Sequence, residues 1–203
     1  MTINTARHWL LAIDVVGYGK GDDQRHRSIQ RVLLELLNEA ADAAVLHRKR
    51  WTIQSTGDGE LAIIPLTESE RRLVDEFIRH LDRLLTQHNA WHIEAARLRL
   101  RVAVHVGVVG PGDNGYTGQA VVQVKRLLEC GALRKAVEAA PEANIVLVVS
   151  DEIHRGMISQ GYTTYRSDDF RRVRVGLKEY RGQAWIHVVA GKATTSGYHQ
   201  GTS

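Results

Sequence analysis

Ser55-Thr56-Gly57-Asp58-Gly59-Glu60 is the segment from which the fold can be worked out. An apolar run lies on each side of it, at residues 51–56 and 61–64, and Asp and Gly favour the tight turn that joins two antiparallel strands. The pattern predicts a β-hairpin with Asp58 at its tip. Most Asp-Gly pairs only make turns, so this carboxylate is a candidate functional group only if a partner lies near it.

A second acidic residue ends an apolar run near the N-terminus. Leu-Leu-Ala-Ile at residues 10–13 is followed by Asp14, and the glycine-bearing segment Gly17-Tyr18-Gly19 comes shortly after it. A carboxylate at the end of a buried strand is costly unless a cation or hydrogen-bond donors neutralise it, which makes Asp14 a candidate functional residue. Two simpler interpretations remain open: Asp14 caps the next segment, and the glycines form an ordinary strand-to-helix turn.

Length and composition favour one globular domain. The chain has 203 residues, 43% of them hydrophobic, which is enough for a full core. We expect a domain over residues 1–190 and a disordered tail over residues 191–203, which are rich in Gly, Thr and Ser. The only cysteine is Cys130, so no disulfide framework is expected.

Charge and hydropathy limit the classes of partner. The net charge is +4, but 27 basic residues are spread among 23 acidic ones, which is typical of a solvated surface and not of a nucleic-acid-binding stripe. No apolar run is long enough to span a membrane, and the N-terminal residues do not resemble a secretion signal. We therefore expect a cytoplasmic protein with no nucleic-acid or membrane partner.

Hydrophobic periodicity predicts the remaining elements. Strands are expected at residues 8–15, 51–56, 61–64, 98–108, 144–149, 163–165, 171–175 and 184–189, and helices at 24–46, 69–88, 118–136 and 151–158. The segment 111–115, Pro-Gly-Asp-Asn-Gly, is expected to break the strand before it. This order predicts an α+β fold: a ferredoxin-like βαββαβ sandwich with a mainly antiparallel sheet, helices on one face and extra C-terminal strands.

Several motifs follow one another along the chain. They are Asp14 before Gly-Tyr at 17–18, residues 55–59, Arg-Leu-Arg-Val-Ala-Val-His-Val-Gly at 99–107, Tyr-Thr-Gly at 116–118 with Lys-Arg-Leu at 125–127, Val-Ser at 149–150, and Gly-Leu-Lys at 176–178. Together they resemble the class III nucleotide cyclase homology domain over residues 8–190. The resemblance implies conversion of a nucleoside triphosphate to a 3′,5′-cyclic nucleotide and pyrophosphate, with two Mg²⁺ or Mn²⁺ ions.

The resemblance also implies roles for individual residues. The metal ligands would be Asp14, Val15 through its carbonyl, and Asp58; the phosphate-binding residues would be Val16, Gly17, Tyr18, Gly19 and Lys178; and Arg126 would stabilise charge in the transition state. Without the resemblance, Arg126 and Lys178 would be read as ordinary surface residues. Because the family takes its metal ligands from one subunit and its helix arginine from the other, a homodimer is expected.

The sequence departs from the family pattern at positions that contact the nucleoside. Val122 stands where the family has an asparagine that orients the ribose, and Gln54 and Gly115 stand at the two base-selecting positions, where purine-specific members have a lysine and an acid. We therefore expect an atypical base preference. A pyrimidine nucleotide is one candidate, as in the bacterial antiviral-defence cyclases that the family contains. His105 is interpreted as structural.

Two other functions remain. The chain could be a catalytically silent module that binds nucleotide or dimerises through the same surfaces. That function would explain why Val122 replaces the asparagine of the family. A basic nucleic-acid-binding domain rests on the net charge alone. The retention of Asp14, Asp58 and Arg126 favours the enzyme.

Overall fold

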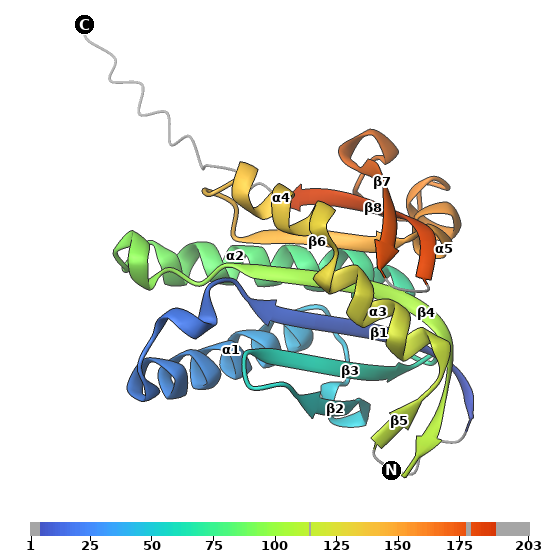
Figure 1. The fold of residues 1–203 in the computed structure, drawn as a ribbon, viewed down its shortest axis with the longest axis horizontal. Helices are drawn as coiled ribbons and strands as arrows, with labels where there is room; N and C mark the ends of the chain where they lie inside the picture. Colours follow the sequence, from blue (N-terminus) through green and yellow to red (C-terminus); the bar gives the residue numbers. More distant parts are fainter. Residues whose placement is uncertain (1–4, 114, 178–179, 190–203) are drawn as a thin grey trace, which may run out of the picture.

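A computed structural model describes residues 5–113, 115–177 and 180–189 (Figure 1). Its strands form one eight-stranded sheet in the order β2-β3-β1-β4-β6-β8-β7, with β5 paired to β4. The pairing of β4 with β6 is parallel and the other pairings are antiparallel. The strands are β1 (Ala6–Val15), β2 (Thr52–Ser55), β3 (Gly59–Pro65), β4 (Leu100–Gly112), β5 (Gly115–Thr117), β6 (Ile145–Ser150), β7 (Arg171–Leu177) and β8 (Tyr180–Val189).

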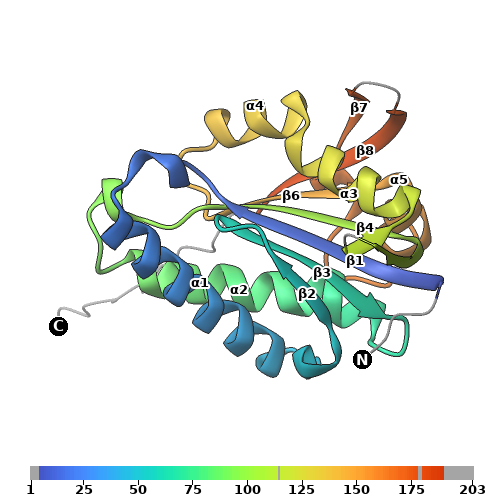
Figure 2. The ribbon, with the colours of Figure 1, turned by 60° about the horizontal axis from the view of Figure 1, so that its bottom comes forward.

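Helices cover both faces of this sheet (Figure 2). They are α1 (Asp23–Ala43), α2 (Phe77–Asn89), α3 (Gln119–Glu129), α4 (Gly131–Ala139) and α5 (Asp151–Ile153), with π-helical turns at Arg72–Glu76 before α2 and at His154–Ile158 after α5. One hydrophobic cluster lies between the sheet and α1 and α2, and a second lies between the sheet and α3 and α4. The α+β class and the mainly antiparallel sheet are confirmed, whereas the placement of all helices on one face is wrong.

The inner strand β1 explains why both faces are covered. Leu11 and Ile13 belong to the cluster under α1 and α2, while Leu10 and Ala12 belong to the cluster under α3 and α4. A strand that is apolar on both sides must be buried on both sides. The uninterrupted apolar run at residues 10–13 already indicated that this strand is buried on both faces.

The helix expected at residues 118–136 is broken in two. Cys130 is buried and extended, with φ −65° and ψ 143°, and it separates α3 from α4. Leu127 and Leu133 lie on either side of the break, and both pack into the same cluster. The break thus lets two short helices follow one face of the sheet.

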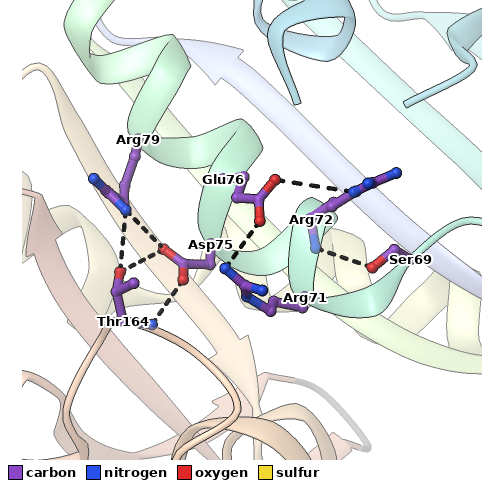
Figure 3. Close-up of polar contacts among 7 residues, drawn as sticks. All are labelled: Ser69, Arg71, Arg72, Asp75, Glu76, Arg79 and Thr164. Atoms are coloured by element: carbon purple, nitrogen blue, oxygen red, sulfur yellow. Dashed lines mark hydrogen bonds and ion pairs between the residues drawn. The ribbon is translucent and has the colours of Figure 1, made fainter. Parts of the chain in front are cut away.

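The strand expected at residues 163–165 is absent, because Thr164 is bonded to a side chain (Figure 3). The buried carboxylate of Asp75 accepts hydrogen bonds from the backbone amide and the hydroxyl of Thr164, both at 2.7 Å. Arg79, one turn further along, lies 3.9 Å from the same carboxylate. These bonds attach the segment to the π-helical turn that precedes α2 and not to the sheet.

The segment at 111–115 also differs from expectation. Instead of ending at Pro111, β4 continues to Gly112 and pairs with β5, so that Pro111 faces Tyr116. The strand β4 therefore does not end at Pro111. The chain reverses its direction after Gly112 and returns as β5. The expected disordered tail, 191–203, lies outside the described residues.

None of the described helices is long and apolar enough to cross a membrane.

Candidate functional site

The two predicted metal-binding acids are brought together by the pairing of β1 with β3. Asp14 lies opposite Gly59 in the register, and the backbone amide of Val15 donates to the carbonyl of Asp58 at 2.8 Å. A glycine is required at position 59, since a Cβ there would lie 1.8 Å from the carbonyl oxygen of Ile13. The turn chemistry of the hairpin therefore places Asp58 beside the end of β1.

Asp14 has a counter-ion that the sequence analysis did not assign. Arg101 faces it from β4 and donates from Nε to Oδ1 at 2.7 Å and from Nη2 to Oδ2 at 2.6 Å. Burial raises the pKa of Asp14 above its usual value; Arg101 opposes this shift, and the charges of Asp58 and Glu129 add to it. The signal available in the sequence was Arg101 inside a largely apolar strand, but its partner lies 87 residues away.

The residues present fit a hard divalent cation on one condition. Asp58 is half-buried, and its carboxylate has no hydrogen bond or ion pair within the described part of the chain. Two carboxylates and the Val15 carbonyl would supply oxygen ligands and leave positions for phosphate oxygens, as Mg²⁺ prefers. The condition is that Arg101 releases Asp14. Over the same residues no group of three or more His, Cys, Asp or Glu is placed to hold a metal.

The loop after β1 keeps three of its four predicted phosphate-binding amides. The amide of Val16 donates to the carbonyl of Arg99 at 2.9 Å, so it is not available to a ligand. Gly17 has a positive φ of 73°, which favours glycine. Within the described chain the amides of Gly17, Tyr18 and Gly19 have no backbone acceptor. The amides of Gly17, Tyr18 and Gly19 therefore remain available for the predicted phosphate contacts, and the amide of Val16 does not.

The predicted catalytic arginine makes no hydrogen bond or ion pair with the two acids. Arg126 lies on α3, which packs against β1 and β4, and its partly buried side chain makes no hydrogen bond or ion pair with any described residue. Glu129, at the end of the same helix, is close enough to Asp14 to raise its pKa. Lys178 lies outside the described residues.

The two base-selecting positions are not brought together in one chain. Gln54 is exposed on the edge strand β2, and Gly115 begins β5; the strands β3, β1 and β4 lie between them. Val122 is 39% exposed on α3. Its neighbour Gln123 lies next to the buried ring of His105. The partly buried side chain of Gln123 is thus directed toward His105.

Comparison with solved structures identifies cyclase domains of the same fold. The chain superposes on an adenylate/guanylate cyclase/hydrolase from Silicibacter pomeroyi with a TM-score of 0.64 and 19% identity, covering 93% of this chain and 100% of that chain. For the guanylyl cyclase Cya2 the TM-score is 0.62 at 13% identity, covering 96% and 98%. For the guanylate cyclase domain of RhGC from Catenaria anguillulae in complex with GTP it is 0.54 at 12%, covering 89% and 94%.

These similarities establish that the chain has the cyclase-domain fold, and they confirm at this level the resemblance drawn from the motifs. Searches with protein-family models and against curated proteins gave no match.

Proposed function

We propose that this chain is a nucleotide cyclase that converts a nucleoside triphosphate into a 3′,5′-cyclic nucleotide and pyrophosphate. The supporting observation is the group formed at one end of β1. Asp14 and Asp58 lie side by side there, and the amides of Gly17, Tyr18 and Gly19 follow, which have no acceptor among the described residues. On a cyclase-domain fold, this arrangement offers oxygen ligands for cations next to donors for phosphate.

The proposed reaction is an intramolecular displacement. The 3′-oxygen forms a bond to the α-phosphorus, the bond from that phosphorus to the oxygen bridging to the β-phosphate breaks, pyrophosphate leaves, and the hydroxyl proton passes to solvent. Two Mg²⁺ or Mn²⁺ ions held by Asp14, Asp58 and the Val15 carbonyl would stabilise the charge on the entering and leaving oxygens. The amides of Gly17, Tyr18 and Gly19 bind the phosphates, and Lys178 is proposed for the terminal ones.

Arg101 has two positions in this proposal. Without substrate it neutralises Asp14 at 2.6–2.7 Å. With a cation bound at Asp14, the guanidinium of Arg101 would be free to bind phosphate oxygens bidentately. Arg101 thereby joins the proposed site, although no role for it was predicted from the sequence.

A second copy of the chain is proposed to complete the site. Arg126 has no partner within the described part of its own chain, and it lies on a helix that exposes Val122. Val108 of β4 is 56% exposed, and its carbonyl borders the start of the same helix at Gly118. Exposed apolar side chains next to a charged group without a partner favour a homodimer contact here.

An atypical base preference is also proposed for this chain. Gln54 can both donate and accept hydrogen bonds, and Gly115 supplies no charge, so ATP is not expected to be strongly preferred over UTP or CTP. A pyrimidine product would suit signalling or antiviral defence. A reducing cytoplasm agrees with the buried free thiol of Cys130.

The test is to incubate the purified protein with each of the four ribonucleoside triphosphates and Mn²⁺, and to measure cyclic monophosphate and pyrophosphate. Wild type and the control Asp42→Asn, which alters an exposed acid of α1, should form product, and Asp58→Asn should form none. Conversion of no triphosphate by wild type would overturn the proposal.

A silent nucleotide-binding module is the second candidate, because both oxygens of Asp14 are engaged by Arg101. In that case calorimetry would detect triphosphate binding although no product forms.

A further inference from the structure

One side chain of α1 bridges the two loops of the proposed site. Gln30 donates from Nε2 to the hydroxyl oxygen of Tyr18 at 2.9 Å and to the carbonyl oxygen of Gly57 at 2.9 Å. Tyr18 belongs to the phosphate-binding loop, and Gly57 precedes Asp58 at the tip of the hairpin. In the sequence, Gln30 is 12 residues from Tyr18 and 27 residues from Gly57.

The orientation of the Gln30 amide follows from its partners. A backbone carbonyl can only accept, so the NH₂ group and not the oxygen must face Gly57. That group has two hydrogens, and the two acceptors use both of them. No other neutral side chain of this length offers two donors on one atom, so the bridge depends on the glutamine amide.

Each end of the bridge is fixed by a further contact. On the loop side, the ring of His26 stacks on Tyr18 at 4.3 Å and 15°, and its Nε2 lies 3.0 Å from the Tyr18 carbonyl oxygen. His26 and Gln30 are one helical turn apart. On the hairpin side, the carbonyls of Gly57 and Asp58 are both held, the first by Gln30 and the second by the amide of Val15. The bridge therefore joins two anchored segments.

We infer that Gln30 is a positioning residue that couples the phosphate-binding loop to the hairpin of Asp58. Phosphate bound at the amides of Gly17 and Gly19 restrains the loop, and through Tyr18 and Gln30 it restrains the backbone that carries Asp58. This inference rests on the proposed function for its biological meaning, and it goes beyond it by naming a residue that touches neither substrate nor metal.

The test is hydrogen exchange on Gln30→Met, which keeps the length of the side chain and removes both donors. The matched control is Gln24→Met, an exposed glutamine of the same helix without a hydrogen bond to any described residue. Without ligand, Gln30→Met should exchange faster than wild type at the bonded amides of the two segments, Lys20 in 17–20 and Thr56 in 56–60, and the control should not. Tyr18→Phe removes only the loop contact, so it should release 17–20 and leave 56–60 protected.

Coupling is measured with inorganic tripolyphosphate as the probe. In wild type it should slow exchange at both segments, and in Gln30→Met at 17–20 only. Mn²⁺ binding, followed by electron paramagnetic resonance, should weaken by about tenfold in Gln30→Met, which corresponds to about 1.4 kcal/mol. Unchanged exchange at 56–60 in Gln30→Met would overturn the inference.

The two proposals fail separately. If wild type converts no triphosphate but Gln30→Met releases both segments, the cyclase assignment falls and the coupling stands. If product forms and tripolyphosphate protects 56–60 equally in wild type and Gln30→Met, the coupling falls. Should Gln30→Met not fold, protection of 17–20 in Tyr18→Phe equal to that in wild type would also overturn it.

Discussion

At the scale of single residues, Arg101 is the counter-ion of the buried acid Asp14. Replacing it by Met leaves Asp14 buried without a counter-ion, and breaking such a buried pair costs about 3–5 kcal/mol of unfolding free energy. Urea denaturation should show this loss, and Mn²⁺ should recover part of it because the ion replaces the missing charge. The control is Arg83→Met, an exposed arginine that makes no ion pair within the described residues. Equal Mn²⁺ stabilisation of Arg101→Met and wild type would contradict the exchange of partners.

His105 gives a pH dependence of stability. The residue is 4% exposed, and among the described residues its Nδ1 has no hydrogen-bond partner but lies 3.5 Å from Oε2 of Glu152. Burial lowers its pKa, Glu152 and Gln123 oppose the shift, and Arg7 adds to it. The unfolded chain therefore takes up the proton at a higher pH than the folded one, and the free energy of unfolding should fall as the pH drops below about 6.5.

His105→Gln should make that fall smaller. Urea denaturation at pH 7.5 and 5.5 measures it, and some dependence should remain because burial also lowers the pKa of His154. An identical pH dependence in wild type and His105→Gln would show that the imidazole of His105 does not titrate on unfolding.

At the scale of elements, the hairpin is held near its tip by a buried ion pair. Arg48 donates from Nη1 and Nη2 to the two oxygens of Glu60 at 2.6 and 2.7 Å, and from Nε to Asn38 at 2.7 Å. Arg48→Met alone should lower the unfolding free energy by about 3–5 kcal/mol, whereas Arg48→Met with Glu60→Leu should recover most of the loss. A double-mutant cycle by urea denaturation measures the coupling. Additive losses would mean that the two charges act independently.

The elements also show how far the sequence could predict the structure. Alternation over 98–108 and the apolar run at 10–13 located β4 and β1, because local patterns specify strands. The break at Cys130 and the bond from Thr164 to Asp75 were missed, since both depend on contacts that form only in the folded chain. The same reason separates the site residues. Asp58 was predicted from turn chemistry and Asp14 from an acid at the end of an apolar run, whereas Arg101 and Gln30 contact residues distant in sequence.

At the scale of the whole molecule, the proposed homodimer makes a prediction about mixed subunits. Mixing Asp58→Ala with Arg126→Ala should restore about a quarter of wild-type product formation, because half of the dimers are mixed and each has one intact site. Mixing Asp58→Ala with Asp14→Ala should restore none, since both acids belong to the same half of the site. No rescue in the first mixture, with subunit exchange proven, would show that one chain does not complete the site of another.

The central position of β1 has a consequence for how the protein is made. Its second neighbour in the sheet carries Arg101, which emerges 87 residues after Asp14. At about 5–20 residues per second, a ribosome leaves β1 with at least one open edge for roughly 4–17 s. During that interval an apolar strand with unpaired amides is exposed to other nascent chains. The residue that neutralises Asp14 thus arrives with the strand that pairs with the second edge of β1, so edge pairing and charge compensation are completed in the same step of synthesis.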